Sequence, residues 1–170
     1  MSLASRIDLS QCAPAQLLAT LDPEVRLVAA RALYTHDWGE APTRREADFT
    51  IMQGMRFRES AVRQLSVDKR AHYLARSVRP TDSLAGSMLL ALHLEHRRAM
   101  LSAFLDALKI PHENGLIAED HDMKPPSAAA LKQAVSTLRD RFPADEVELY
   151  LATLYVLDRD TWAGLATLLE

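Results

Sequence analysis

Residues 84–108, LAGSMLLALHLEHRRAMLSAFLDAL, decide the fold class. The first part of this stretch, 84–94, is apolar on almost every side of a helix, which is typical of a helix at the centre of a domain. The polar run EHRR follows at 95–98, and an apolar stripe resumes from Met100 to Leu108. We expect one long helix at 82–109, stopped by Pro111, that leaves the core or carries a polar site at its midpoint.

Further helices on both sides of this segment are predicted by helix caps (Ser66, Ser127 and a capping box of Thr43 with Glu46), by prolines at or near first helical positions (Pro14 and Pro23) and by breaking prolines. Their expected ranges are 14–18, 23–36, 43–65, 67–78, 128–142, 144–157, and a last one from Asp158 or Asp160 to the end. Residues 111–126 show no sustained period and are expected to be irregular, and no strand is predicted. The prediction is an all-α single domain over 1–170, with about eight helices in antiparallel hairpins around the helix at 82–109, as a helical bundle or short α-solenoid-like array.

The amino-acid composition agrees with a core of packed helices and restricts the expected cellular location. Apolar residues make up 48% of the 170 residues and aromatic residues only 6%, so the core is expected to consist mainly of Leu, Ala, Val and Met. The one cysteine, Cys12, excludes an internal disulfide and a cysteine-based zinc site. The uncharged run at residues 83–94 is 12 residues long and the one at 9–21 is 13, whereas a membrane-spanning helix needs about 20 residues. We expect a cytoplasmic protein with no membrane segment, and the excess of Arg over Lys, 16 to 4, indicates a bacterial source.

Residues 17–33, LLATLDPEVRLVAARAL, resemble a single HEAT-type helical repeat. In that family two antiparallel helices are joined by an Asp-Pro turn, which would here be Asp22-Pro23. The resemblance implies that Val25 packs inward and that Arg26 pairs with acids in neighbouring turns. One such unit is fewer than the three or so repeats that a stable solenoid needs. The resemblance therefore implies stacked helical hairpins, whether or not they form a repeat array.

A metal site is one alternative function. His93 and His96 lie three residues apart on the long helix and can share a face. His112 and His121 lie in the irregular segment among several carboxylates and could complete the site in space. Imidazole and carboxylate ligands suit zinc, manganese or iron, so this pattern would indicate a metal-dependent enzyme. The structural alternative is that His93 belongs to the core and His96 to the surface.

Nucleic-acid binding is a second alternative. Residues 43–98 carry 11 basic and 6 acidic side chains, whereas residues 99–170 carry 6 and 12. Arg56, Arg63 and Arg70 are spaced by seven within the Arg-rich segment 43–79. Acidic residues are interleaved with these arginines, so a solvated face with ion pairs, or attraction between the two halves, explains the same pattern.

Partner binding is the function that we place first. Met-rich apolar faces adapt to partner helices, and the bulky candidates for such a surface are Met52, Met55, Phe57, Tyr155 and Trp162. Ordinary core packing would explain these side chains equally. No Gly-x-Ser-x-Gly nucleophile motif and no glycine-rich phosphate loop occurs, so no cofactor is expected. The sequence therefore predicts a helical scaffold or protein-interaction module, a homodimer, without catalytic chemistry.

Overall fold

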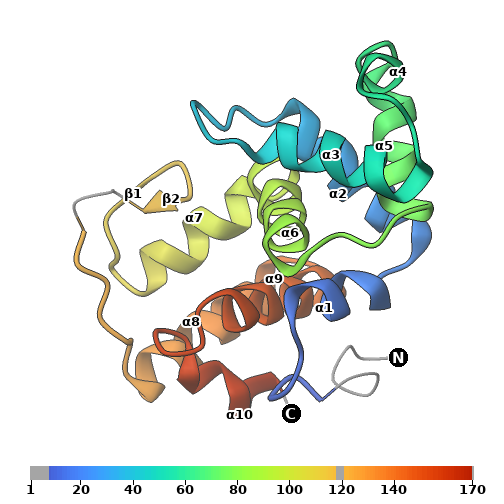
Figure 1. The fold of residues 1–170 in the computed structure, drawn as a ribbon. Coiled ribbons are helices and arrows are strands. Elements are labelled where there is room, and N and C mark those ends of the chain that lie inside the picture. The colour runs from blue at the N-terminus through green and yellow to red at the C-terminus, as the bar shows by residue number, and fades with distance from the viewer. Residues whose placement is uncertain (1–7, 118–120, 170) are drawn as a thin grey trace. The chain divides into compact units, whose positions relative to one another are not determined.

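The computed structural model describes residues 8–117 and 121–169, and the fold is all-α (Figure 1). These described residues form ten α-helices, one 3-10 turn and one two-stranded hairpin. The predicted fold class is confirmed. The count of about eight helices was low because two of the expected helices are each divided in two.

The described chain forms two compact units, each of which is internally packed. The first is residues 13–95, and the second is the described part of 1–12 and 96–170. We call them the 13–95 unit and the 96–169 unit. The single domain predicted over 1–170 stays a prediction. The helices of the 13–95 unit are α1 (Pro14–Thr20), α2 (Pro23–Thr35), α3 (Thr43–Met55), α4 (Glu59–Arg63), α5 (Val67–Arg76) and α6 (Asp82–His96), the last of which ends at the boundary.

In the 13–95 unit α2 packs mainly against α5, and α3 contacts α2, α4 and α5. The apolar stripe of α2 is buried, with Ala29, Ala30 and Leu33 fully inaccessible. Helix α6 is tied to the rest of this unit through its first turn, where the Asp82 Oδ1 accepts a hydrogen bond of 3.0 Å from the Ala15 backbone N–H of α1. This bond supplies an acceptor to one of the N–H groups that the start of a helix leaves unsatisfied.

The expected helix at 82–109 is broken at Arg97, whose φ of −135° and ψ of 25° leave the helical region. The chain continues as α7 (Arg98–Ala107). The Arg97 side chain is only 12% exposed, and its Nε lies 3.6 Å from the Glu146 Oε2. Burial lowers the pKa of the Arg97 guanidinium, while Glu146 and Asp145 oppose that shift. The predicted helix thus divides in two within the polar run at 95–98, where the part-buried guanidinium of Arg97 has an acidic partner in Glu146.

The start of α3 differs from the predicted capping box. Pro42 takes the cap position, and Thr43 is the first helical residue and is buried. The Glu46 carboxylate instead accepts a hydrogen bond of 2.8 Å from the Thr81 hydroxyl ahead of α6. A tertiary partner therefore replaces the local cap. In contrast, the predicted caps Ser66 and Ser127 do accept hydrogen bonds from the Lys69 and Ala130 backbone N–H groups.

The 96–169 unit contains α7, a β-hairpin and the C-terminal helices. Its further elements are β1 (His112–Glu113), β2 (Leu116–Ile117), α8 (Ala128–Arg141), α9 (Ala144–Leu157), the 3-10 turn Ala163–Leu165 and α10 (Ala166–Leu169). Helix α7 packs on α8, and α9 contacts α8 and α10. The ring of Phe104 is fully buried at the centre of this unit, 5.5 Å from the ring of Tyr150 and 5.7 Å from that of Trp162.

The hairpin corrects the prediction that residues 111–126 contain no strand. Asn114 and Gly115 adopt φ values of 50° and 85°, which a two-residue hairpin turn with matching twist requires. The antiparallel strands pair His112 with Ile117 and Glu113 with Leu116. Gly115 also lies so close to α7 that an added Cβ would be 2.9 Å from the Leu101 Cβ. The Asn-Gly pair was visible in the sequence, but strands of two residues are too short to show an alternating pattern.

Replacing Gly115 by alanine is expected to lower the free energy of unfolding by about 2–3 kcal/mol, since the left-handed backbone and the contact with Leu101 both oppose a Cβ. Gly39 is the matched control, because its φ is also positive at 58° but nothing lies within 4 Å of an added Cβ. Gly39→Ala should cost only about 1 kcal/mol. Urea denaturation of both variants measures the difference, and equal losses would show that the hairpin does not pack on Leu101.

Candidate functional site

The histidines predicted as metal ligands have different environments. His93 is 1% exposed in the core, whereas His96, on the same helix, is exposed. Both ring nitrogens of His112 are engaged, since its Nδ1 accepts from the Gly115 N–H at 3.1 Å and its Nε2 lies 3.1 Å from the Asp106 Oδ1. His121 is half-buried. Over residues 8–117 and 121–169, no three His, Cys, Asp or Glu side chains are grouped so that they could hold a metal ion.

The arginines predicted as a nucleic-acid surface lie on three separate elements. Arg56 is the residue after α3, Arg63 is the last residue of α4, and Arg70 is within α5. Arg63 forms an ion pair with Glu59 one turn earlier. The Arg70 Nη1 donates to the Asp48 carboxylate at 3.0 Å, and its guanidinium lies 5.5 Å from the centre of the Tyr34 ring. Two of the three guanidiniums are therefore committed to contacts within the 13–95 unit.

The five bulky side chains proposed as an interaction surface do not form one surface. Tyr155 and Trp162 are 9% and 5% exposed and belong to the packing of the 96–169 unit, so they are not surface anchors in this structure. Phe57 is half-buried, with its ring edge-on to that of Tyr73 in α5 at 5.4 Å. Met52 and Met55 are half-buried. Of this set, Met52 lines a groove beside α3.

A groove between α3 and α4 is the candidate functional site, and a break in the predicted helix at 43–65 creates it. The chain leaves α3 at Arg56, which takes a left-handed conformation with a φ of 55°. The Met52 carbonyl accepts hydrogen bonds from the backbone N–H groups of Arg56 and Phe57, as is common at left-handed helix ends. The packing of Phe57 on Tyr73 accompanies this reversal. Helix α4 thereby returns alongside α3, which a continuous helix would not allow.

The groove encloses about 360 Å³ and combines an apolar centre with a charged rim. Val62 forms its buried floor, and Phe49 is the most exposed large apolar side chain of the described residues, at 57%. The buried face of α3 carries Thr43, Ala47 and Ile51, so Phe49 points away from it. The full lining is Arg45, Asp48, Phe49, Met52, Glu59, Val62 and Arg63. Phe49 was missed in the sequence, although its position off the buried stripe was a usable signal.

A part-buried polar network supports the inner wall of this groove. The Tyr34 hydroxyl donates to the Asp48 Oδ1 at 2.9 Å, and Arg70 binds the other carboxylate oxygen. Burial raises the pKa of the Tyr34 phenol, and the Asp48 carboxylate raises it further. Arg70 forms an ion pair with Asp48 and Arg63 forms one with Glu59, so Arg45 leaves the rim of the groove with a positive balance.

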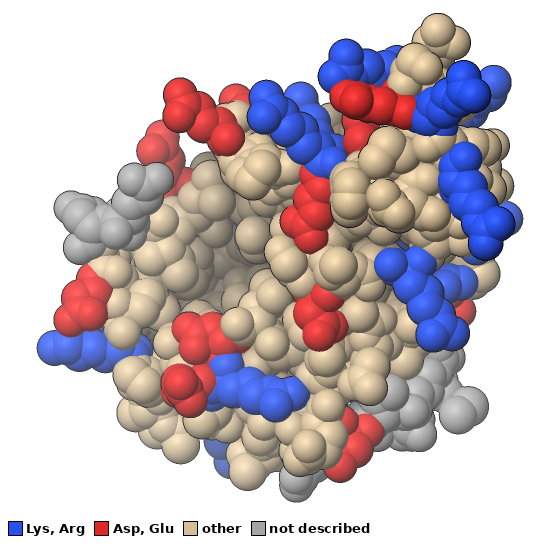
Figure 2. Space-filling view, viewed as in Figure 1, with Lys and Arg blue, Asp and Glu red and all other residues tan. Residues whose placement is uncertain are grey.

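Three exposed arginines lie at or near the groove: Arg45 lines it, and Arg56 and Arg58 belong to the turn between α3 and α4. Arg45, Arg56 and Arg58 are exposed, and no ion pair to them occurs within the described residues. Figure 2 shows Lys and Arg side chains gathered over the region that Figure 1 labels α3, α4 and α5. An apolar centre within a positive surface suits an apolar side chain that is flanked by acids.

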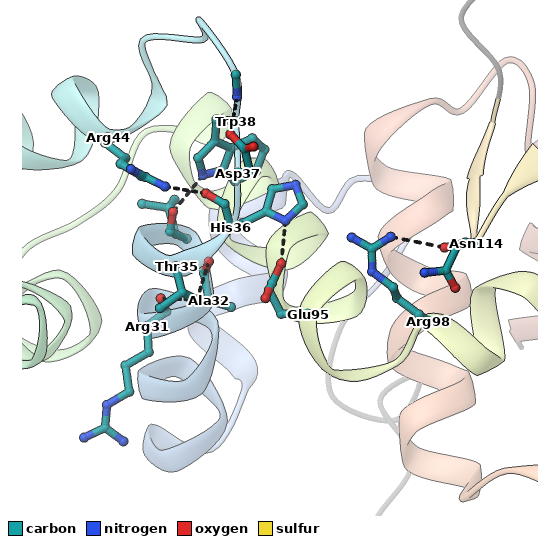
Figure 3. Close-up of polar contacts among 12 residues, drawn as sticks. Arg31, Ala32, Thr35, His36, Asp37, Trp38, Arg44, Glu95, Arg98 and Asn114 are labelled. Atoms are coloured by element: carbon teal, nitrogen blue, oxygen red, sulfur yellow. Dashed lines mark hydrogen bonds and ion pairs between the residues drawn. The ribbon is translucent and has the colours of Figure 1, made fainter.

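A second polar cluster fastens the loop between α2 and α3 (Figure 3). The His36 Nδ1 lies 2.6 Å from the Glu95 Oε1 near the end of α6, and the Arg44 guanidinium donates to the His36 carbonyl at 2.7 Å. The Trp38 ring stands edge-on to the His36 imidazole at 4.7 Å. His36 is 8% exposed, and its contact with Glu95 joins the end of α2 to α6.

No protein-family model, no curated protein and no solved structure matches this chain. Its fold defines its class as an all-α helical protein. Among the described residues, no helix combines the length and the apolar character needed to cross a membrane.

Proposed function

We propose that this chain is a helical interaction module that assembles as a homodimer, with no chemistry of its own. The observation that carries the proposal is Phe49, which is 57% exposed in a groove beside Met52. A large apolar side chain at the edge of an apolar groove is stabilised when a partner removes both from water, at about 25 cal/mol for each Å² buried. Such a patch rimmed by charged residues is typical of interaction sites.

Charge complementarity supports a second copy of the chain as the occupant. Residues 13–95 carry 11 basic and 10 acidic side chains, whereas the rest of the chain carries 9 and 13. The positive rim of the groove therefore complements the acidic 96–169 unit of another copy. In a symmetric dimer this contact forms twice, because each copy offers both surfaces.

Leu157, at the end of α9, is the apolar group that we place in the partner's groove. It is 42% exposed and is followed by Asp158 and Asp160. The intervening Arg159 is engaged within its own unit, since it donates to the Cys12 carbonyl and its guanidinium lies 5.7 Å from the centre of the Tyr155 ring. The segment thus presents a leucine that is followed by two acids.

Sedimentation velocity tests the assembly directly. The unaltered chain is expected to sediment as a dimer of its 19.0 kDa protomer, and Phe49→Ser is expected to sediment as a monomer. Val67→Ser is the matched control, since Val67 is also exposed, at 42%, but lies outside the groove. A monomeric unaltered chain at every concentration, or a dimer that survives Phe49→Ser, would overturn the proposal.

A charge exchange tests which surfaces meet. Arg45→Glu is expected to weaken the dimer, and adding Asp160→Arg to the same chain is expected to restore it. The nucleic-acid alternative has its own outcome in this experiment. If duplex DNA binds at low salt, is released steeply as salt rises and competes with the dimer, the Arg-rich surface is a nucleic-acid interface and the homodimer proposal fails.

A further inference from the structure

A second cavity in the 13–95 unit, of about 590 Å³, combines an apolar wall with three arginines. It lies between α1, α2, the end of α5 and α6. Leu18, Leu74 and Met88 form a wall that is almost fully buried, at 3%, 1% and 0% exposed. The guanidinium-bearing side chains around it are Arg26, Arg76 and Arg79.

Arg26 is the half-buried arginine of this cavity. Its Nε is buried, and no hydrogen-bond partner for it occurs within the described residues. The ion pair that the HEAT-type resemblance implied for Arg26 is likewise not formed in the described part of the chain. A buried N–H donor without an acceptor is unfavourable, so an anion entering the cavity would satisfy a group that the protein itself leaves unsatisfied.

The other two arginines add positive charge from the end of α5. The Arg76 Nη2 donates to the Glu24 Oε1 at 2.6 Å, so one acid offsets part of this charge. Arg79 follows three residues later, is exposed and has no ion pair among the described residues. Among the described residues, the lining of the cavity thus contains three guanidiniums and no carboxylate beside an apolar wall.

We propose that this cavity binds a small organic anion with an apolar body, such as a phosphate or carboxylate on an alkyl or aromatic group. The oxygen atoms of the anion accept hydrogen bonds from Arg26 and Arg79, since guanidinium groups match the geometry of carboxylate and phosphate. The apolar body lies against Leu18, Leu74 and Met88. The volume is within the range of about 300–1,000 Å³ that is usual for small-molecule sites.

Fluorescence titration with anilinonaphthalene sulfonate, an anionic probe with an apolar body, tests the site. We expect one bound probe per chain, displaced by octyl phosphate but not by an equal concentration of inorganic phosphate or octyltrimethylammonium. Displacement by phosphatidate vesicles as well would assign the same chemistry to a lipid headgroup, whereas displacement by octyl phosphate alone would assign it to a soluble ligand. Equal displacement by the cationic and anionic octyl compounds would overturn the proposal.

Variants locate the binding. Arg26→Gln is expected to weaken octyl phosphate binding by about tenfold. Arg58→Gln, which removes an exposed arginine that does not line the cavity, is expected to leave it within about twofold. Arg79→Gln should show the same loss as Arg26→Gln, and because Arg79 is exposed the test holds even if Arg26→Gln fails to fold.

A variant that fills the cavity tests the proposal independently. Ala19 lines the cavity and is exposed on α1, so Ala19→Trp is expected to fill the space without disturbing the core and to abolish binding. Unchanged affinity in Ala19→Trp and in both arginine variants would overturn the proposal. The outcome does not depend on the dimer, since Phe49→Ser changes the other groove and should bind the probe normally.

Discussion

Replacing Phe104 by alanine is expected to lower the free energy of unfolding by about 3–5 kcal/mol. Phe104 is fully buried, and its ring lies edge-on to that of Tyr150, with an interplanar angle of 87°. The tilted ring of Trp162 lies on it at 5.7 Å. Removing the phenyl group therefore loses apolar burial and two aromatic contacts, and it leaves a cavity at the centre of the 96–169 unit.

Urea denaturation followed by circular dichroism and by tryptophan fluorescence measures this loss, since Trp162 reports on the same cluster. Phe142→Ala is the control, because Phe142 is half-buried at the end of α8 and its ring lies against the guanidinium of the neighbouring Arg141, 5.5 Å from the ring centre. We expect it to cost less than about 1.5 kcal/mol. A Phe104→Ala loss no larger than that of the control would contradict the packing described for this unit.

Replacing Asp48 by alanine is expected to lower the free energy of unfolding by about 2–3 kcal/mol. Asp48 accepts hydrogen bonds from the Tyr34 hydroxyl and from Arg70, and its side chain is 28% exposed. Without the carboxylate, a part-buried phenol and a guanidinium lose their shared acceptor. The inner wall of the α3–α4 groove would lose its support at the same time.

A double-mutant cycle with Tyr34→Phe separates the parts of this effect. The two substitutions should cost less together than the sum of their separate losses, since both remove the same hydrogen bond. Asp68→Ala is the matched control, because Asp68 also pairs with an arginine, Arg31, but its side chain is 76% exposed. It should cost no more than about 1 kcal/mol. Additive losses, or an Asp48→Ala effect as small as that of the control, would refute the network.

The positions where helices begin could be predicted from residues close in the sequence. Ser66 and Ser127 were predicted as caps and accept hydrogen bonds from the first turns of α5 and α8. Pro14 and Pro23 begin α1 and α2 as their fixed φ predicts. These predictions succeeded because a cap and a first-turn proline act on backbone groups within three or four residues.

The positions where helices break could not be predicted from residues close in the sequence. The reversal at Arg56 is accompanied by the packing of Phe57 on Tyr73, and the helix break at Arg97 by the contact with Glu146. In each case the stabilising partner is far away in the sequence. The functional sites depend on the same long-range contacts, so Met52 was a candidate from the sequence, whereas Phe49 and the cavity around Arg26 were not.

The amino-acid sequence determined the helical class and most helix positions, because the 3.6-residue spacing of Leu, Ala and Val and the capping residues act over one or two turns. The tertiary structure decided which apolar side chains stay exposed and which charges remain unpaired. Phe49 becomes part of a groove only when α4 returns alongside α3, and Arg26 lines a cavity only when α1 and the end of α5 come together. Burial and pairing depend on neighbours from distant segments, which the local pattern of residues does not specify.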